Sequence, residues 1–321
     1  MHSKPGLSPA MVGLIAAVIT VSIWTSFIVI ARASAQLTLR PLDIAFVRLV
    51  GAAAVLMPWG WWINRQAARA GQPTGWLGVS PLPARTTMVC GLFGGLLYGI
   101  LVYSGFFLAP AAHASVLMPG SLPLWTALLA LWLLRERVSA PRALGLAFIV
   151  GGDLLVGGAS LLQAFDGGSV WRGDLLFMSA AMCWSCYSVL ARRYGLGAVH
   201  ATIAVSTFAA LLYVPVFLLL VSQGLLATAL PQAPWAEIIF QMLFMGVGSV
   251  VISGITFTMM IRHYGPVRST MITAFVPGLS ALGAVIFLGE PLGWNLWAGL
   301  ALVTAGIMFG VRGVAPQAAA R

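Results

Sequence analysis

Charged side chains are scarce in this sequence. Only 7% of its 321 residues are Asp, Glu, Lys or Arg, whereas 60% are hydrophobic and the mean hydropathy is +0.98. Soluble domains carry about 25% charged residues. A chain with so little charge cannot cover its surface with water-binding groups, so its solvent must be the lipid bilayer. The net charge of +10 therefore does not indicate a nucleic-acid partner.

Motifs of enzymes are also missing. The chain has no H-E-x-x-H, no G-x-S-x-G and no pair of carboxylates within one apolar run. His113, His200 and His263 fall at the ends of such runs. Cysteines are few and lie in apolar runs, so no disulfide framework is expected. The C-x-x-C of Cys183 and Cys186 is more typical of small packing residues than of a redox or metal site. We expect no catalytic residue, metal ion or cofactor.

A stretch of the chain occurs twice, as 111–136 and 265–290. A second repeat, at a shift of 160 residues, relates Trp24–Arg32 to Trp184–Arg192. The chain is therefore predicted to consist of two related halves, 1–165 and 166–321. At a shift of 154 residues the equivalent pairs are Ser115 and Ser269, Pro123 and Pro277, Glu136 and Glu290, Gly145 and Gly299, and Gly152 and Gly306.

Ten apolar runs are long enough to cross a bilayer core, which needs about 20 residues per helix. They cover residues 10–31, 42–63, 87–108, 112–134, 142–162, 173–193, 201–222, 236–261, 267–288 and 294–312. Because five spans per half is an odd number, the second half must enter the membrane upside down relative to the first. The predicted fold is an all-α membrane protein of ten transmembrane helices in two inverted five-helix repeats.

The positive charges predict the orientation of these spans. With a cytoplasmic N-terminus, most of the 17 Lys and Arg residues fall in cytoplasmic segments, and the outer segments hold only Arg32, Arg40 and Arg172. Cytoplasmic loops of membrane proteins carry such an excess of Lys and Arg. Both termini are therefore expected in the cytoplasm, with Asp166 outside.

Prolines interrupt the fourth and ninth spans at equivalent places. Pro119, Pro123 and Pro277 cannot donate hydrogen bonds, so the carbonyl four residues before each of them, Thr273 among these, is left free. Broken helices at corresponding positions of inverted repeats mark the substrate site of many transporters. Alternatively, the prolines only kink packed helices. At helical spacing, Ser115, Met118, Leu122 and Trp125 would share one face beside the freed carbonyls.

Aromatic residues near the middle of spans should face the protein interior, because an indole N–H against lipid would have no partner. They are Trp24, Trp125, Trp184, Tyr98, Tyr103 and Tyr187. Such rings could stack on a planar or apolar substrate, or they could simply be packing residues. Gly91, Gly95 and Gly99 of the third span form two G-x-x-x-G steps, which would let a neighbouring helix approach closely.

Ionisable groups at membrane depth are costly and often functional. They are Arg48, Asp153 and, nearer the outer surface, His113. Two hypotheses follow for Arg48: it clamps a substrate carboxylate while Asp153 is neutral and structural, or it pairs with an acid, Asp153 or Asp43. Glu136 and Glu290 end their spans, and we expect each to cap the helix that follows it.

These features together resemble the EamA-type transporters of the drug/metabolite transporter superfamily. The resemblance runs from about Val12 to Gly310 and includes Arg48 within PLDIAFVRLVGAAAV. It implies a basket in which spans 1–4 and 6–9 line a central cavity and spans 5 and 10 lie outside. Members are mostly inner-membrane exporters of amino acids, other metabolites and toxic compounds. Related short multidrug pumps carry a proton-coupling Glu in the first span, which this chain lacks.

The favoured function is a multi-pass inner-membrane transporter, a monomer or homodimer, that exports amino acids or related compounds, aromatic ones included, by alternating access. Alternatives are a lipid or amphiphile flippase, a drug exporter, a sugar-phosphate carrier and an intramembrane enzyme. A sugar-phosphate carrier would need several basic residues in its spans, where this chain has Arg48. The candidate substrate-binding residues are Trp24, Arg48, Tyr98, Tyr103, Ser115, Met118, Trp125, Trp184, Tyr187 and Thr273, and the candidate hinge residues are Pro119, Pro123 and Pro277.

Overall fold

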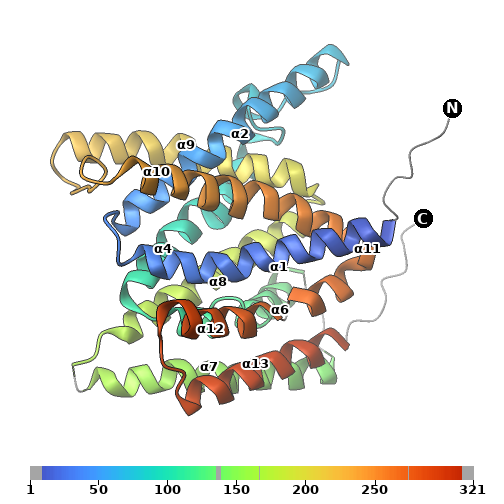
Figure 1. Ribbon diagram of the computed structural model, residues 1–321. Coiled ribbons are helices and arrows are strands. Elements are labelled where there is room, and N and C mark those ends of the chain that lie inside the picture. The colour runs from blue at the N-terminus through green and yellow to red at the C-terminus, as the bar shows by residue number, and fades with distance from the viewer. Residues whose placement is uncertain (1–8, 135–138, 166, 274, 313–321) are drawn as a thin grey trace, which may run out of the picture.

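The computed structural model describes residues 9–134, 139–165, 167–273 and 275–312, and throughout these ranges the regular structure is helical, with no strand (Figure 1). Eight helical segments are long and apolar enough to cross a membrane, and Phe275–Leu288 and Trp294–Phe309 are shorter apolar helices. Together they supply the ten expected crossings, so the predicted all-α membrane fold is confirmed.

The first half contains α1 (Pro9–Ser34), α2 (Pro41–Arg69), a short 3₁₀ turn η1 (Trp76–Gly78), α3 (Ala84–Gly91), η2 (Leu92–Leu97), α4 (Tyr98–Leu108), α5 (Ala111–Leu117), α6 (Leu122–Leu134) and α7 (Ala140–Ala164). The second half contains α8 (Val170–Arg193), α9 (Ala198–Ser222), α10 (Trp235–Gln241), η3 (Met242–Ile252), α11 (Ser253–Thr273), α12 (Phe275–Leu288) and α13 (Trp294–Arg312).

Two predicted boundaries were wrong. The second span was expected to end at residue 63, but α2 continues to Arg69. The connection expected at 262–266 is part of α11, which runs on to Thr273. This stretch contains Pro266. A proline removes only one backbone donor, however, and a helix in a membrane bundle can continue through it where neighbouring groups compensate.

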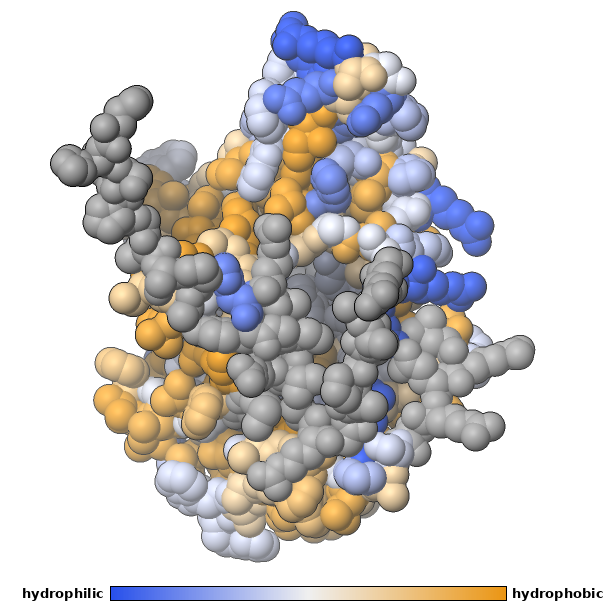
Figure 2. Space-filling view, turned by 90° about the vertical axis from the view of Figure 1, so that its right-hand side faces the viewer, coloured by the Kyte–Doolittle hydropathy of each residue, from blue (hydrophilic) through white to orange (hydrophobic). Residues whose placement is uncertain are grey.

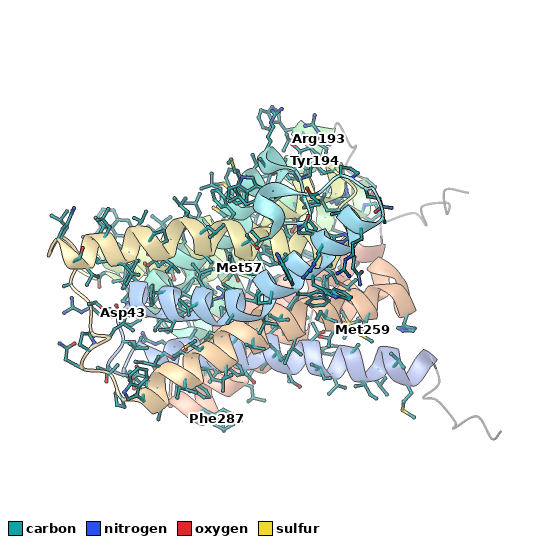
Figure 3. All side chains as sticks on the ribbon, turned by 90° about the horizontal axis from the view of Figure 1, so that it is seen from above. Asp43, Met57, Arg193, Tyr194, Met259 and Phe287 are labelled. Carbon is teal, nitrogen blue, oxygen red and sulfur yellow. The ribbon has the colours of Figure 1, made fainter. Side chains whose placement is uncertain are left out.

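The loops gather at two ends of the bundle, which we name by their charge. The arginine-poor end contains the segments 35–40, 109–110, 167–169, 223–234 and 289–293. The arginine-rich end contains 70–83 and 194–197, which adjoin Arg69, Arg85 and Arg193. Seen from above, Asp43 lies at the arginine-poor end and Arg193 at the arginine-rich end (Figure 3). Figure 2 looks at the arginine-rich end and shows hydrophilic side chains gathered where α2 projects, with hydrophobic surface on the flanks.

The helices of one half pack against those of the other in a repeated pattern. In the interior, α1 packs against α11 and α12, and its equivalent α8 packs against α4 and α6. Likewise α2 packs against η3, and its equivalent α9 packs against α3. Outside this set, α7 and α13 lie side by side along one edge of the bundle (Figure 1). This is the pairing expected of two halves related by an inverted repeat.

Glycines let α7 and α13 approach closely. A Cβ atom added to Gly152 would lie 2.7 Å from the carbonyl oxygen of Gly299, and one added to Gly306 would lie 2.5 Å from that of Gly145. These are the glycines that the repeat relates, Gly145 to Gly299 and Gly152 to Gly306. Each glycine therefore meets the repeat equivalent of the other glycine on its own helix, so the two contacts between α7 and α13 are related by the repeat.

The third helix of each half contains a π-helical segment. In the first half it is η2, and in the second it is η3. At the shift of 154 residues, 92–97 corresponds to 246–251, which lies inside η3. Such wide turns are rare and are frequent at functional sites. Gly91, just before η2, and Gly95, within it, also allow close packing, because Gly91 lies against Phe208 and Gly95 against Val205 of α9.

Candidate functional site

The fourth crossing is interrupted between α5 and α6. Residues 118–121 form turns, and the hydroxyl of Ser121 donates to the carbonyl of Leu117 at 2.6 Å. A side chain thus replaces a backbone donor at the break. Regular helix does not continue from Ser115 to Trp125, so the shared face expected for Ser115, Met118, Leu122 and Trp125 remains a prediction.

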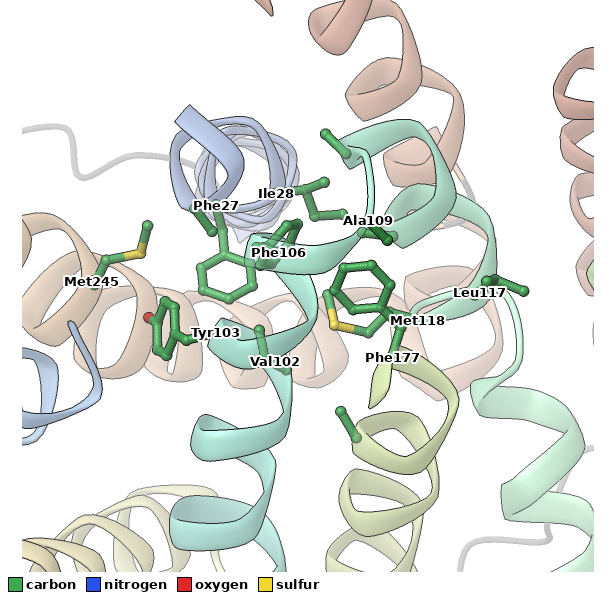
Figure 4. Close-up of a cluster of buried hydrophobic side chains, with 14 of the residues drawn as sticks. Phe27, Ile28, Val102, Tyr103, Phe106, Ala109, Leu117, Met118, Phe177 and Met245 are labelled. Carbon is green, nitrogen blue, oxygen red and sulfur yellow. The ribbon is translucent and has the colours of Figure 1, made fainter. Parts of the chain in front are cut away.

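Arg48 of α2 lies among three aromatic rings. Its Cζ atom is 5.9 Å from the ring centroid of Phe27, 5.8 Å from that of Tyr98 and 5.7 Å from that of Tyr103. Gly99 leaves room for the guanidinium, since a Cβ there would stand 3.8 Å from Nη1. Rings at these distances attract a cation through their quadrupoles. Figure 4 shows Phe27 and Tyr103 between α1 and α4.

Buried polar atoms remain unsatisfied beside this cation. The Nε atom of Arg48 and the hydroxyl of Tyr103 are buried and have no hydrogen-bond partner among the described residues. Acidic side chains in the described ranges do not pair with Arg48 either, since the ion pairs there are Arg32 with Glu290 and His113 with Asp174. The guanidinium and the phenol can therefore both donate to an added anion.

Tyr98 joins this group to the broken helix and to α8. Its hydroxyl lies 4.0 Å from the sulfur of Met118, and its ring centroid lies 4.9 Å from that of Trp184. Trp184 in turn lies 5.3 Å from Tyr187, which packs against Gly94 of η2. Six of the predicted site residues therefore adjoin one another: Arg48, Tyr98, Tyr103, Met118, Trp184 and Tyr187.

The other predicted residues have different surroundings. Trp24 packs against Phe257 of α11, with ring centroids 5.1 Å apart. The hydroxyl of Ser115 is buried and donates to the carbonyl of Ala111, in its own helix, at 2.8 Å. The indole nitrogen of Trp125 is buried and has no partner among the described residues. Thr273, at the end of α11, is half-buried.

The three candidate hinge prolines occupy different positions. Pro119 lies in the interruption itself, and Pro123 lies in the first turn of α6. Pro277, the repeat equivalent of Pro123, is buried and likewise lies in the first turn of its helix, α12. Residue 274, which the repeat relates to Gly120 of the interruption, lies outside the described residues.

Arg48 pairs with neither of the acids proposed as its partners. Both carboxylate oxygens of Asp153 are buried and have no hydrogen-bond partner in the described ranges. Asp43 accepts from the backbone N–H of Arg40 at 3.0 Å, the hydroxyl of Thr228 at 2.6 Å and the N–H of Ala229 at 2.9 Å. The pairing hypothesis was therefore wrong. Asp43 caps its own helix and fastens the 223–234 segment.

The sequence did not predict an ion pair at the arginine-poor end. Arg32 of α1 contacts Glu290 at 2.9 Å between Nε and Oε1, and its Nη1 donates to the carbonyl of Phe106 at 2.8 Å. The other oxygen of Glu290 accepts from the N–H of Ala112 at 3.2 Å. Glu290 thus caps α5 of the opposite half. The expectation that it caps the helix that follows it was wrong, and Glu136 lies outside the described residues.

A second polar cluster at this end joins three helices. His113 of α5 contacts Asp174 of α8 at 2.9 Å through Nδ1, and the hydroxyl of Ser160 of α7 donates to the other carboxylate oxygen of Asp174. Both His113 and Ser160 line a cavity of about 390 Å³, to which Arg32, Glu290 and Asn295 also contribute. The sequence singled out His113 but gave no sign of its partners.

A second cavity of about 400 Å³ is almost wholly apolar. It lies between α2 and the segment that leads into α10, near the arginine-poor end. Its lining residues are Phe46, Val47, Val50, Leu230, Pro231, Ala233, Trp235, Ile238 and Met242.

Comparison with known proteins places these features in context. The model of the EamA-like transporter family matches residues 11–158 and 171–312. The uncharacterized transporter YyaM of Bacillus subtilis is 30% identical over 107 residues, which are 33% of this chain and 35% of that protein. An uncharacterized transporter of Archaeoglobus fulgidus is 30% identical over 198 residues, 60% of this chain and 61% of its own length. These matches thus span about a third and three fifths of the two relatives.

One solved crystal structure is similar over almost the whole chain. It has a TM-score of 0.56 and 21% sequence identity, and the match covers 93% of this chain and 96% of that one. At this identity the likeness concerns the fold alone.

Proposed function

The chain belongs to the EamA-like transporter family, and we propose that it exports amino acids or related carboxylated metabolites across the inner membrane by alternating access. Both termini would lie in the cytoplasm, and the arginine-poor end would face outward. The distribution of Lys and Arg between the two ends supports this orientation.

The proposal rests on the surroundings of Arg48. Arg48 is a permanently charged group inside the bundle, surrounded by aromatic rings and without an acidic partner among the described residues. A buried charge is stable only when it is paired or well solvated by hydrogen bonds. The planar guanidinium matches the two oxygens of a carboxylate. A substrate carboxylate would therefore supply the charge that Arg48 lacks, and the nearby hydroxyl of Tyr103 would add a third donor.

The rings beside Arg48 support an aromatic preference among carboxylated substrates. Tyr98, Trp184 and Tyr187 continue from the guanidinium along η2 and α8. A substrate held by its carboxylate at Arg48 would direct its side chain onto these faces. Stacking of a planar group on an aromatic residue contributes about 1–3 kcal/mol, by analogy with nucleic-acid bases.

Alternating access is supported by the contacts between the halves. Arg32 of α1 pairs with Glu290 in the 289–293 segment of the other half and also donates to the carbonyl of Phe106. Glu290 in turn accepts from the N–H of Ala112 at the start of α5. The pair therefore connects the two halves at this end. The break between α5 and α6 contains Met118, whose sulfur lies 4.0 Å from the hydroxyl of Tyr98. Movement at this break would change both the substrate site and the tie at the arginine-poor end.

Transport of radiolabelled amino acids into liposomes that contain the purified protein tests the proposal. We expect uptake of carboxylated, and most strongly of aromatic, amino acids above that of empty liposomes. Arg48→Gln should abolish most of it, and Arg48→Lys should already weaken it, because an ammonium cannot form the two parallel hydrogen bonds.

A variant at Asp153, a second buried ionisable residue, serves as the comparison for substrate binding. Loss of one charge-assisted hydrogen bond typically costs about 1.5–3 kcal/mol, or roughly ten- to 150-fold in affinity. Asp153 lies away from the aromatic rings around Arg48, so the Asp153→Asn protein should bind substrate as well as the wild type does. A folded Arg48→Gln protein that transports amino acids at the normal rate would end the carboxylate proposal.

The apolar cavity between α2 and α10 favours a second candidate, a flippase or exporter of amphiphiles. The lining of this cavity is suited to an acyl chain. One lining residue, Val47, directly precedes Arg48 in α2. Scrambling of a fluorescent phospholipid in the same liposomes would distinguish the two candidates, because amino-acid export predicts no lipid movement above the background of empty liposomes.

A further inference from the structure

Asp153 is a carboxyl group at mid-membrane depth. It lies near the middle of α7, which spans Ala140–Ala164, and is only 6% exposed. Neither of its oxygens has a hydrogen-bond partner among the described residues. A carboxylate in such surroundings would be an uncompensated buried charge, which proteins avoid by neutralising the group. A protonated, neutral carboxyl at Asp153 would avoid this cost.

Packing does not require an acid at this position. The repeat relates Asp153 of α7 to Ile307 of α13, and Ile307 is also 6% exposed. The flanking glycines, Gly152 and Gly306, occupy equivalent places in the close α7–α13 contact. An isoleucine therefore satisfies the same environment in the second half. The acid in the first half is a departure from the repeat that packing alone does not explain.

The helices packed against α7 offer Asp153 no counter-ion. They are α5, α6, α8 and α13. Within the described side chains, α6 and α13 have no ionisable group, α5 has His113, and α8 has Asp174 and Arg172 toward the arginine-poor end. His113 and Asp174 are paired with each other.

Other charged or titratable groups are far along their helices or weakly acidic. On α7 itself, Arg142 lies eleven residues before Asp153, about 16 Å along the helix. The opposite end of α8 carries Arg192 and Arg193, and its middle carries the thiols of Cys183 and Cys186.

A polar route leads from Asp153 toward the arginine-poor end. Ser160 lies seven residues further along α7, two turns away on the same face and about 10 Å distant. Its hydroxyl contacts Asp174, which contacts His113, and both Ser160 and His113 line the cavity of about 390 Å³. Between Asp153 and Ser160, Val156 is buried. Gly157 faces Leu117, the last residue of α5, since a Cβ added to Gly157 would lie 3.8 Å from a methyl carbon of Leu117.

We infer that Asp153 is a proton-binding site that couples movement of α5 against α7 to proton exchange. In the conformation described, Leu117 and Val156 separate the protonated carboxyl from the cavity. When α5 moves away at its break, water can enter along the Ser160 face. The O–H bond of Asp153 then breaks, the proton passes to that water, and the carboxylate remains hydrated until it is protonated again.

Infrared spectroscopy of the full-length protein in lipid tests the protonation directly and needs no substrate. At neutral pH we expect the carbonyl stretch of a protonated, buried carboxylic acid in the wild type and its loss in Asp153→Asn. Glu237→Gln, which changes an acid at the start of α10, is the matched control and should keep the band. A band that is unchanged in Asp153→Asn would overturn the inference.

A second variant separates a proton site from a structural acid. Asp153→Ile copies the residue at the equivalent position in α13, and its melting temperature should equal or exceed that of the wild type. A fall in melting temperature in both Asp153→Ile and Asp153→Asn would show that the acid holds the fold together and would contradict the inference.

Coupling itself is measured by transport, and this arm rests on the proposed function. With a pH gradient imposed, the wild type should accumulate the labelled amino acid, whereas Asp153→Asn should only equilibrate it across the membrane. Accumulation by Asp153→Asn at the wild-type level would refute coupling. If the wild type moves no amino acid, the proposed substrate is wrong, and the infrared and stability results still decide whether Asp153 binds the proton.

Discussion

Arg32 and Glu290 form a 2.9 Å ion pair between the first helix of one half and the end of the ninth crossing in the other. Each partner has a further bond, Arg32 to the carbonyl of Phe106 and Glu290 to the N–H of Ala112. The two side chains therefore hold both sides of the short turn between α4 and α5. This turn leads directly into the broken helix.

Neutralising either partner should loosen the arginine-poor end. We expect Arg32→Gln and Glu290→Gln each to reduce the free energy of unfolding by about 1.5–3 kcal/mol, since each loses a charge-assisted hydrogen bond in half-buried surroundings. Because the two groups act on each other, the double variant should cost less than the sum of the single ones. Thermal unfolding in detergent measures all three.

The control for this pair is Arg172→Gln at the same end. Arg172 lies over the ring of its neighbour Trp171 at 5.6 Å, and its side chain forms no ion pair with a described residue of the first half. Its loss should change the melting temperature little. Strict additivity of the Arg32 and Glu290 effects would mean that the contact contributes nothing to stability.

The stacking role of Trp184 can be separated from ordinary packing. Trp184→Ala removes the ring next to Tyr98 and should weaken binding of an aromatic amino acid by about 1–3 kcal/mol, roughly five- to 150-fold. Binding of an aliphatic amino acid should change less. Equilibrium binding to the purified protein measures both.

Trp24→Ala provides the comparison for Trp184→Ala. Trp24 is the repeat equivalent of Trp184, but its ring packs against Phe257 and has no ring contact with Tyr98 or Tyr187. It should therefore lower stability without selective loss of aromatic substrates. Equal effects of the two variants on binding would make Trp184 a packing residue as well.

The contact between α7 and α13 should tolerate no added side chain at Gly152. A Cβ there would meet the carbonyl oxygen of Gly299 at 2.7 Å, so Gly152→Val must push the helices apart. Overpacking of this kind costs about 1–3 kcal/mol. Gly158→Ala, on the same helix, is the control, because nothing lies within 4 Å of its Cβ position. A Gly152→Val protein that melts with the wild type would contradict the close contact.

The orientation can be tested by labelling from outside the cell. On a background without the native cysteines, Gly168→Cys at the arginine-poor end should react with an impermeant maleimide. Tyr194→Cys at the arginine-rich end should react only after the membrane is opened. Both positions are exposed in the structure, so the membrane alone decides access. The reverse labelling pattern would invert the proposed topology.

The sequence predicted part of the site because that part depends on depth. Arg48, Tyr98, Tyr103 and Trp184 were placed in the interior since polar atoms at mid-membrane must avoid lipid, and the structure brings these four together. The same argument also selected Trp24 and Trp125, which lie elsewhere. Depth restricts a side chain to the interior, but it does not determine which neighbour the side chain meets there.

Composition, apolar run length and the internal repeat were sufficient to predict the helical membrane fold, its ten crossings and the inversion of its halves. Each of these follows from a local requirement. A segment of about 20 residues that crosses the bilayer must form the hydrogen bonds of its backbone N–H and C=O groups within itself. Only the tertiary structure decided the partners of Arg32 and His113 and the rings that surround Arg48. It also left Asp153 without a hydrogen-bond partner among the described residues. Arg32 and Glu290 are 258 residues apart in the chain, and their contact depends on how two halves pack. That packing is a property of the whole bundle, and no local pattern in the sequence encodes it.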